Sequence, residues 1–111
     1  MDIPDKIRAA SDEQSASSLD AARKFLHIYY ADTVSVEETR RHLVSTAAMN
    51  PRTILEGLAG IEALLAQPPA PGTLSRLVAI DANENIDDPS DEGARIWLQE
   101  AAQLARDVIG R

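Results

Sequence analysis

The sequence predicts an all-α fold, a single-domain bundle of about five helices. Apolar residues recur at spacings of three and four along most of the chain, as they do on one face of a helix. The two-residue alternation typical of strands is confined to residues 33–36. A length of 111 residues fits one compact domain. Because residues 1–17 are polar and rich in serine, we expect a flexible or frayed segment there and the helical domain over residues 18–111.

The first two expected helices are marked by an apolar stripe and by a cap. The first covers about residues 18–31, and its stripe consists of Leu19, Ala22, Leu26 and Tyr29, flanked by Phe25 and Tyr30. The second begins after Ser35, because Ser35 and Glu38 form a Ser-x-x-Glu capping box. Its apolar face consists of Val36, Leu43, Val44 and Ala47.

The third expected helix covers about residues 51–67 and contains two glycines. Asn50 and Pro51 start it as N-cap and first helical residue. Its apolar stripe consists of Ile54, Leu55, Leu58, Ile61, Leu64 and Leu65. Gly57 and Gly60 lie inside it, where each glycine costs about 1 kcal/mol relative to alanine. We therefore expect another helix to approach closely at these two positions, where a side chain would prevent contact.

A proline-rich corner over residues 68–72 precedes a short fourth helix over about residues 73–82. The inward side chains expected there are Leu74, Leu77 and Val78, with Ile80 as a further candidate. Ser90 caps the last helix, which runs to Gly110. Its apolar face consists of either Ile96 or Trp97, with Ala101, Leu104 and Val108. Phe25, Tyr29, Tyr30 and Trp97 are assigned to the core, the last two with a polar tip at the surface.

Composition excludes several classes of protein. Without cysteine there is no disulfide framework, thiolate nucleophile or cysteine-bound zinc. No stretch approaches the roughly 20 apolar residues of a membrane span, and the N-terminus lacks an apolar signal segment. We therefore expect a cytoplasmic protein that does not contact a membrane. A net charge of −7, with Arg23-Lys24 and Arg40-Arg41 as the only basic doublets, argues against nucleic-acid binding.

We expect no enzymatic activity, because no known catalytic motif is present. The sequence has no Gly-x-Ser-x-Gly, Ser-x-x-Lys, His-Glu-x-x-His or phosphate-loop pattern. His27 and His42 lie on different expected helices, and neither is followed at three or four residues by a histidine or carboxylate. No catalytic residue and no cofactor is therefore predicted.

The acidic charge is concentrated in one segment, residues 81–92. This segment holds six acids and no base, leaving twelve acids and eleven bases in the rest of the chain. The six acids are Asp81, Glu84, Asp87, Asp88, Asp91 and Glu92. Together with Glu37 and Glu38 of the second helix, they form the predicted binding surface for a basic protein partner.

The same segment comes close to the pattern of a calcium loop. Asp81, Asn83, Asn85 and Asp87 occupy positions 1, 3, 5 and 7, and Glu92 falls at position 12. Position 6 needs a residue that tolerates a left-handed conformation, and the β-branched Ile86 stands there in place of glycine. No metal ligand is predicted, and a calcium-binding module at residues 81–92 is kept as an alternative.

The order of elements resembles the small helical immunity proteins of contact-dependent growth inhibition systems. The resemblance covers roughly Leu19 to Ile109. It is carried by Phe25-Leu26-x-x-Tyr29-Tyr30-x-Asp32, the leucine-rich helix with Leu55, Leu58, Leu64 and Leu65, a polar acidic turn, and Trp97-Leu98. It implies a non-catalytic protein that binds and neutralises a cognate toxin domain, which we expect to be basic and nuclease-like. The more acidic segment 81–92 and the proline-rich corner depart from it. A second hypothesis is a homo-oligomeric adaptor that uses Gly57 and Gly60 or an exposed apolar helix face.

Overall fold

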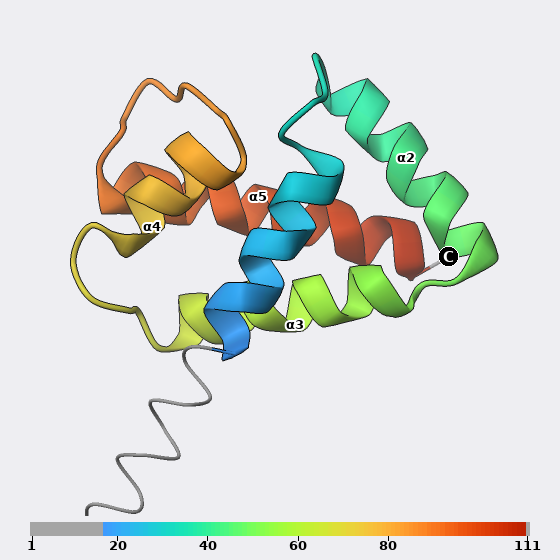
Figure 1. Ribbon diagram of the computed structural model, residues 1–111, viewed down its shortest axis with the longest axis horizontal. Helices are drawn as coiled ribbons and strands as arrows, with labels where there is room; N and C mark the ends of the chain where they lie inside the picture. The colour runs from blue at the N-terminus through green and yellow to red at the C-terminus, as the bar shows by residue number, and fades with distance from the viewer. Residues whose placement is uncertain (1–16, 111) are drawn as a thin grey trace, which may run out of the picture.

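The computed structural model describes residues 17–110, which form a bundle of packed helices (Figure 1). No strand occurs among these residues, and the predicted all-α, single-domain class is confirmed. The elements are a first helix over residues 17–29, α2 (Val36–Met49), α3 (Arg52–Ala66), α4 (Thr73–Arg76), the π-helical turn η1 (Leu77–Asp81) and α5 (Asp91–Ile109). The expected frayed segment 1–17 lies outside the described residues except for Ser17, which is helical.

Helix α5 is the central element of the bundle. It packs against α2, α3, α4 and η1, while the first helix crosses in front of α3 and α5 in Figure 1. Four alanines of α5 are buried, Ala94, Ala101, Ala102 and Ala105, and their small side chains let neighbouring helices approach closely. The largest fully buried side chains include Phe25, Leu26, Tyr29, Leu43, Ile54, Ile61, Leu77 and Leu98. The core therefore draws on every helix from the first to α5.

The two glycines of α3 lie where the first helix touches it, as the sequence predicts. A Cβ atom at Gly57 would lie within 2.6 Å of three atoms of Phe25. One at Gly60 would lie 2.7 Å from the carbonyl oxygen of Ser18. Both glycines are buried, so in this fold neither is available for contact with a second copy of the chain.

The predicted serine caps are confirmed at the starts of α2 and α5, whereas the N-cap of α3 is Pro51 and not Asn50 as predicted. Ser35 Oγ accepts a hydrogen bond from the Glu38 N–H at 3.2 Å, and Ser90 Oγ accepts one from the Gly93 N–H at 3.3 Å. The Asn50 side chain accepts one from the Arg52 N–H at 3.1 Å, although α3 begins at Arg52, one residue later than expected. Each cap satisfies a backbone N–H that has no partner inside its helix.

Several residues expected on inward faces are exposed instead. Val44 and Leu55 directly follow the buried Leu43 and Ile54, so they are turned about 100° away from them around the helix axis. Ile96 is likewise exposed beside Trp97, which packs against the core, so Trp97 is the inward one of the two alternatives. At these three positions, only one of two adjacent apolar residues faces the core.

Val36 and Ile80 are exposed for other reasons. Val36 is the first residue of α2, and further along this helix Thr39 takes the inward position beside Leu43. The Thr39 hydroxyl donates to the carbonyl oxygen of Tyr29 at 3.1 Å. Ile80 lies in η1, where the Ala82 N–H reaches back five residues. The wider π turn buries Ala82 and leaves Ile80 outside.

The helices of residues 17–110 are too short or too polar to span a membrane.

Candidate functional site

The predicted acidic surface is divided by the fold, and Asp81 lies on its inner side. Its carboxylate accepts a hydrogen bond from His27 Nε2 at 2.9 Å and lies 3.5 Å from Arg23 Nε. Only 14% of the Asp81 side chain is exposed. Asp81 therefore joins the end of η1 to the first helix and presents little charge to a partner.

The Asp91 carboxylate is also used within the fold, where it accepts two backbone hydrogen bonds. One carboxylate oxygen accepts a hydrogen bond from the Gly72 N–H at 2.7 Å, and the other accepts one from the Ser75 N–H at 3.0 Å. These bonds cap the start of α4, where Gly72 adopts a left-handed conformation with φ of 89°. They also hold the pKa of the Asp91 carboxyl below its ordinary value of 3.8, the bond from Gly72 contributing most.

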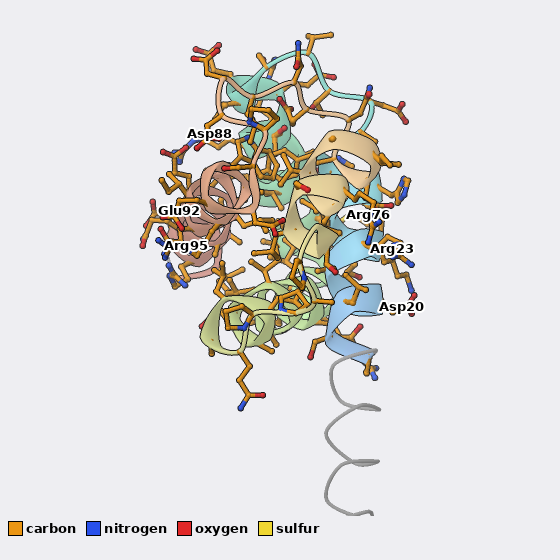
Figure 2. All side chains as sticks on the ribbon, turned by 90° about the vertical axis from the view of Figure 1, so that its left-hand side faces the viewer. Asp20, Arg23, Arg76, Asp88, Glu92 and Arg95 are labelled. Atoms are coloured by element: carbon orange, nitrogen blue, oxygen red, sulfur yellow. The ribbon has the colours of Figure 1, made fainter. Side chains whose placement is uncertain are left out.

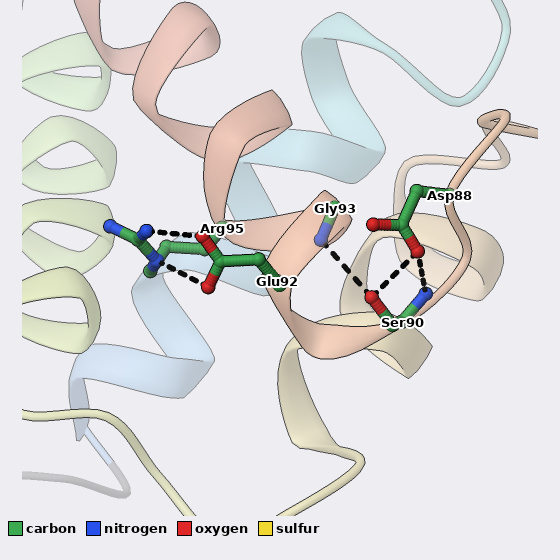
Figure 3. Close-up of polar contacts among 5 residues, drawn as sticks. All are labelled: Asp88, Ser90, Glu92, Gly93 and Arg95. Carbon is green, nitrogen blue, oxygen red and sulfur yellow. Dashed lines mark hydrogen bonds and ion pairs between the residues drawn. The ribbon is translucent and has the colours of Figure 1, made fainter.

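Asp88 and Ser90 form a local network at the start of α5 (Figure 3). Asp88 Oδ1 accepts hydrogen bonds from the Ser90 hydroxyl at 2.6 Å and from the Ser90 N–H at 3.1 Å. The bond from the Ser90 hydroxyl is the main cause of the lowered pKa of Asp88. Gly93 is required beside them, because a Cβ atom there would overlap the Asp88 carbonyl oxygen.

The remaining predicted acids outside the 83–88 loop also contact their own chain or lie apart. Glu92 forms a two-point ion pair with Arg95, which lowers the pKa of Glu92 and raises that of Arg95 (Figure 3). Glu38 accepts a hydrogen bond from the Val34 N–H at 3.1 Å, so it helps to cap α2. Glu37 is exposed in the first turn of α2.

The other three acids, Glu84, Asp87 and Asp88, line depressions that meet at Trp97. One depression of about 440 Å³ lies between the loop and α5 and is lined by Asp87, Asp88, Ile96, Trp97 and Glu100. A second, of about 310 Å³, lies between α2 and α5 and is lined by Val36, Arg40, Trp97, Glu100 and Asp107. A third, of about 350 Å³, is lined by Tyr30, Thr33, Asn83, Glu84 and Trp97. We call this surface the Trp97 face and the third depression the Tyr30 pocket.

The Trp97 face combines aromatic, aliphatic and acidic groups. The rings of Tyr30 and Trp97 meet edge to face, with centroids 4.9 Å apart and an angle of 66° between their planes. Val34 and Val36, at the turn beside them, are 92% and 66% exposed. In Figure 2, Asp88 and Glu92 lie on one side of the molecule, whereas Asp20, Arg23 and Arg76 lie on the other. Asp88 thus lies away from the labelled residues of the first helix and α4.

A backbone reversal after η1 places Glu84 beside Tyr30. Asn83 has a φ of 54°, the left-handed conformation that asparagine tolerates better than most residues. The Glu84 N–H then donates to the carbonyl oxygen of Val78 at 3.1 Å. Partial burial raises the pKa of the Glu84 carboxyl. Burial first, and the Glu84 charge second, raise the pKa of Tyr30.

The geometry of residues 81–92 does not favour the calcium alternative. Asp81 is directed to Arg23 and His27, and Glu92 to Arg95. Across residues 17–110 no group of three or more histidine or acidic side chains is arranged to hold a metal ion. The left-handed residue of the segment is Asn83, three positions before Ile86, so the loop does not follow the calcium-loop conformation.

The sequence alone did not reveal the pairing of His27 with Asp81, because the two residues are 54 positions apart. It also did not reveal Glu100 and Asp107 as part of the Trp97 face. The available signal was helical spacing on α5, because Glu100 follows Trp97 by three residues and Asp107 follows Glu100 by seven. Glu38 could be found from sequence as a cap residue, and the structure gives it that role through the Val34 N–H.

The chain matches no known protein family, no curated protein and no solved structure. Its function therefore has to be argued from the Trp97 face itself.

Proposed function

We propose that this chain is a non-catalytic inhibitor of the immunity type, which acts in the cytoplasm by binding a basic toxin domain through the Trp97 face. The single observation that carries the proposal is the meeting of three depressions at one tryptophan within an acidic rim. Tryptophan, tyrosine and arginine supply most of the binding energy in protein interfaces, commonly from such central positions. The resemblance of the helix order and of the residues around Tyr30 and Trp97 to immunity proteins supports the same function.

Charge complementarity defines the partner. Glu84, Asp87 and Glu100 line the depressions around Trp97, where Arg40 is the single base among the lining residues. The chain carries a net charge of −7. A toxin that cleaves nucleic acid needs a basic surface to hold phosphates, and carboxylates can occupy the place of those phosphates. Opposite charges also accelerate the encounter of two proteins and suppress wrong partners. A basic, nuclease-like toxin domain therefore fits this face best.

The test uses charge reversal at positions that leave the fold intact. Asp88 and Asp91 are unsuitable, because their carboxylates hold the starts of α5 and α4. Asp87 and Glu100 are exposed and line the face. We expect the gene next to that of this chain to encode the toxin domain. Asp87→Lys with Glu100→Lys should then abolish protection of cells that express this domain, while circular dichroism of the variant stays helical.

The matched control is Asp20→Lys with Glu56→Lys, which makes the same change in charge on the first helix and on α3. Both residues are exposed there. This variant should protect cells as well as the wild-type chain. Full protection by the Asp87 and Glu100 variant, or equal loss of protection by both variants, would contradict the proposal.

A further inference from the structure

We infer that the Tyr30 pocket receives the guanidinium group of one arginine side chain of the partner. That the arginine comes from the partner rests on the proposed function. The preference for a guanidinium group is argued from the residues that line the pocket. The pocket holds about 350 Å³, close to the lower end of the range of about 300–1,000 Å³ for small-ligand sites. It is therefore large enough for the end of one side chain and too small for an extended peptide.

Two aromatic rings and one carboxylate give the pocket its preference for a cation. The rings of Tyr30 and Trp97 form a corner, with centroids 4.9 Å apart. The faces of such rings attract cations. Tyr30 is buried, so the contact with a cation falls to the partly buried Trp97, against which the Tyr30 ring packs. Glu84 lies in the lining of the same pocket and supplies a negative charge that is partly shielded from water. Burial first, and the nearby Glu84 charge second, raise the pKa of Tyr30, which places the Glu84 carboxylate close to the tyrosine.

The polar lining favours arginine over lysine. A guanidinium group is planar, stacks on aromatic rings and offers five N–H donors in a fixed fork. Four of the lining residues, Thr33, Ser35, Asn83 and Glu84, carry side-chain oxygen atoms, and the Thr33 and Ser35 hydroxyls already bond within the fold. Asn83 uses its side-chain N–H₂ group on the carbonyl oxygen of Ala31, at 3.4 Å, which leaves its own side-chain oxygen free to accept. A lysine ammonium has three donors and no flat surface to stack.

Both walls of the pocket are fixed by bonds of the fold. On one side, the Thr33 and Thr39 hydroxyls are 2.9 Å apart, and Thr33 N–H donates to the carbonyl oxygen of Tyr30 at 3.2 Å. On the other side, the hydrogen bond of the Glu84 N–H to Val78 fixes the chain after Asn83. Only 6% of Tyr30 is exposed, so its ring is held by packing. A site whose walls are already ordered loses little entropy when it is filled.

Trp97 is the single tryptophan of the chain, so tryptophan signals report on the Tyr30 pocket alone. The probe is N-acetyl-arginine amide, titrated to tens of millimolar at constant ionic strength against the wild-type chain. Binding is followed by tryptophan fluorescence and by the indole N–H resonance. We expect a saturable change with the arginine amide, a weaker one with N-acetyl-lysine amide, and none with N-acetyl-citrulline amide, which has the same shape without the charge.

Two variants locate the binding to this pocket. Glu84→Gln should lower the affinity for the arginine amide about tenfold, which is the loss expected for one charge-assisted hydrogen bond. Glu56→Gln, the same change on α3, should leave it unaltered. No saturable change with the arginine amide, equal changes with the citrulline amide, equal or tighter binding of the lysine amide, or unaltered binding to Glu84→Gln would overturn the inference.

The source of the arginine is tested with the toxin domain. The arginine amide should compete with it, and Glu84→Gln should lower its affinity by a similar factor. If the amide binds but Glu84→Gln leaves the toxin affinity unchanged, the assignment of the arginine to the partner is overturned. If the amide binds but the Asp87 and Glu100 reversal leaves protection intact, the proposed function fails while the chemistry of the pocket stands.

Discussion

The carboxylate of Asp91 accepts a 2.7 Å hydrogen bond from the backbone N–H of Gly72, 19 residues earlier in the chain. Asp91 is the first residue of α5, and Gly72 directly precedes α4. The second carboxylate oxygen of Asp91 accepts a hydrogen bond from the Ser75 N–H within α4. One side chain thus caps a different helix from the one it belongs to, and it ties the proline-rich corner to the central helix.

We predict that Asp91→Ala lowers the stability of the fold, because the Gly72 and Ser75 N–H groups lose their acceptor. The measurement is the urea midpoint of unfolding, followed by circular dichroism. Asp87→Ala is the control, since Asp87 is an exposed acid in the loop leading to the same helix. Equal midpoints for the two variants would show that the bonds to Asp91 contribute nothing to stability.

We also predict that the protein loses stability in acid. Three carboxyl groups, Asp88, Asp91 and Glu92, have pKa values lowered by hydrogen bonds in the folded state. Such groups bind protons more tightly when unfolded, so their stabilisation is complete above the unfolded pKa values and is lost as the pH falls through the lower, folded values. The ordinary values of 3.8 for aspartate and 4.5 for glutamate place the onset of this loss near those pH values.

The pH prediction is measured by urea unfolding at intervals from about pH 7 to about pH 3. Asp91→Asn should show a shallower decline in stability than the wild-type chain, because one of the three groups no longer titrates. An unfolding midpoint that stays constant or rises as the pH falls through this range would contradict the prediction.

Gly57→Ala should destabilise the protein, although alanine is the better helix former by about 1 kcal/mol. The added methyl group would lie within 2.6 Å of Phe25, whose side chain is fully buried and has no room to move away. Overpacking of this kind typically costs about 1–3 kcal/mol. Ala59→Gly, at an exposed site of the same helix, should lose only the helix propensity of about 1 kcal/mol. A higher unfolding midpoint for Gly57→Ala would contradict the close approach of the first helix.

The local elements could be predicted from sequence because their signals are local. The Ser35 and Ser90 caps lie within three residues of the N–H groups they satisfy, and the two glycines of α3 mark a helix contact by their cost alone. Local signals could not predict that Val44 and Leu55 are exposed. Each is one of two adjacent apolar residues, and only packing against other helices decides which of the two faces inward.

The candidate site could be predicted only in part, because a carboxylate's role depends on distant neighbours. Asp81 and Asp87 are equivalent in a charge count, yet one is held by Arg23 and His27 and the other lines the Trp97 face. Asp91 bonds to a residue of another helix. The Trp97 face itself is assembled from a turn, a loop and α5, three segments that no sequence pattern brings together.

The last prediction concerns Thr39, the only polar residue buried among those described, with 1% exposed. Its hydroxyl donates to the carbonyl oxygen of Tyr29 and lies 2.9 Å from the hydroxyl of Thr33. Thr39→Val keeps the volume but removes these bonds, and leaving a buried acceptor unsatisfied costs about 1–3 kcal/mol. Thr39→Ser keeps the hydroxyl and loses one methyl group, at about 0.8 kcal/mol.

We therefore expect the urea midpoint of Thr39→Val to lie below that of Thr39→Ser. The valine variant should also broaden the indole resonance of Trp97, because the turn that carries Thr33 forms one wall of the Tyr30 pocket. The reverse order of midpoints would show that the methyl group of Thr39 matters more than its hydroxyl. An unaltered Trp97 resonance in the valine variant would show that the hydrogen bonds of Thr39 are not needed to keep the Tyr30 pocket ordered.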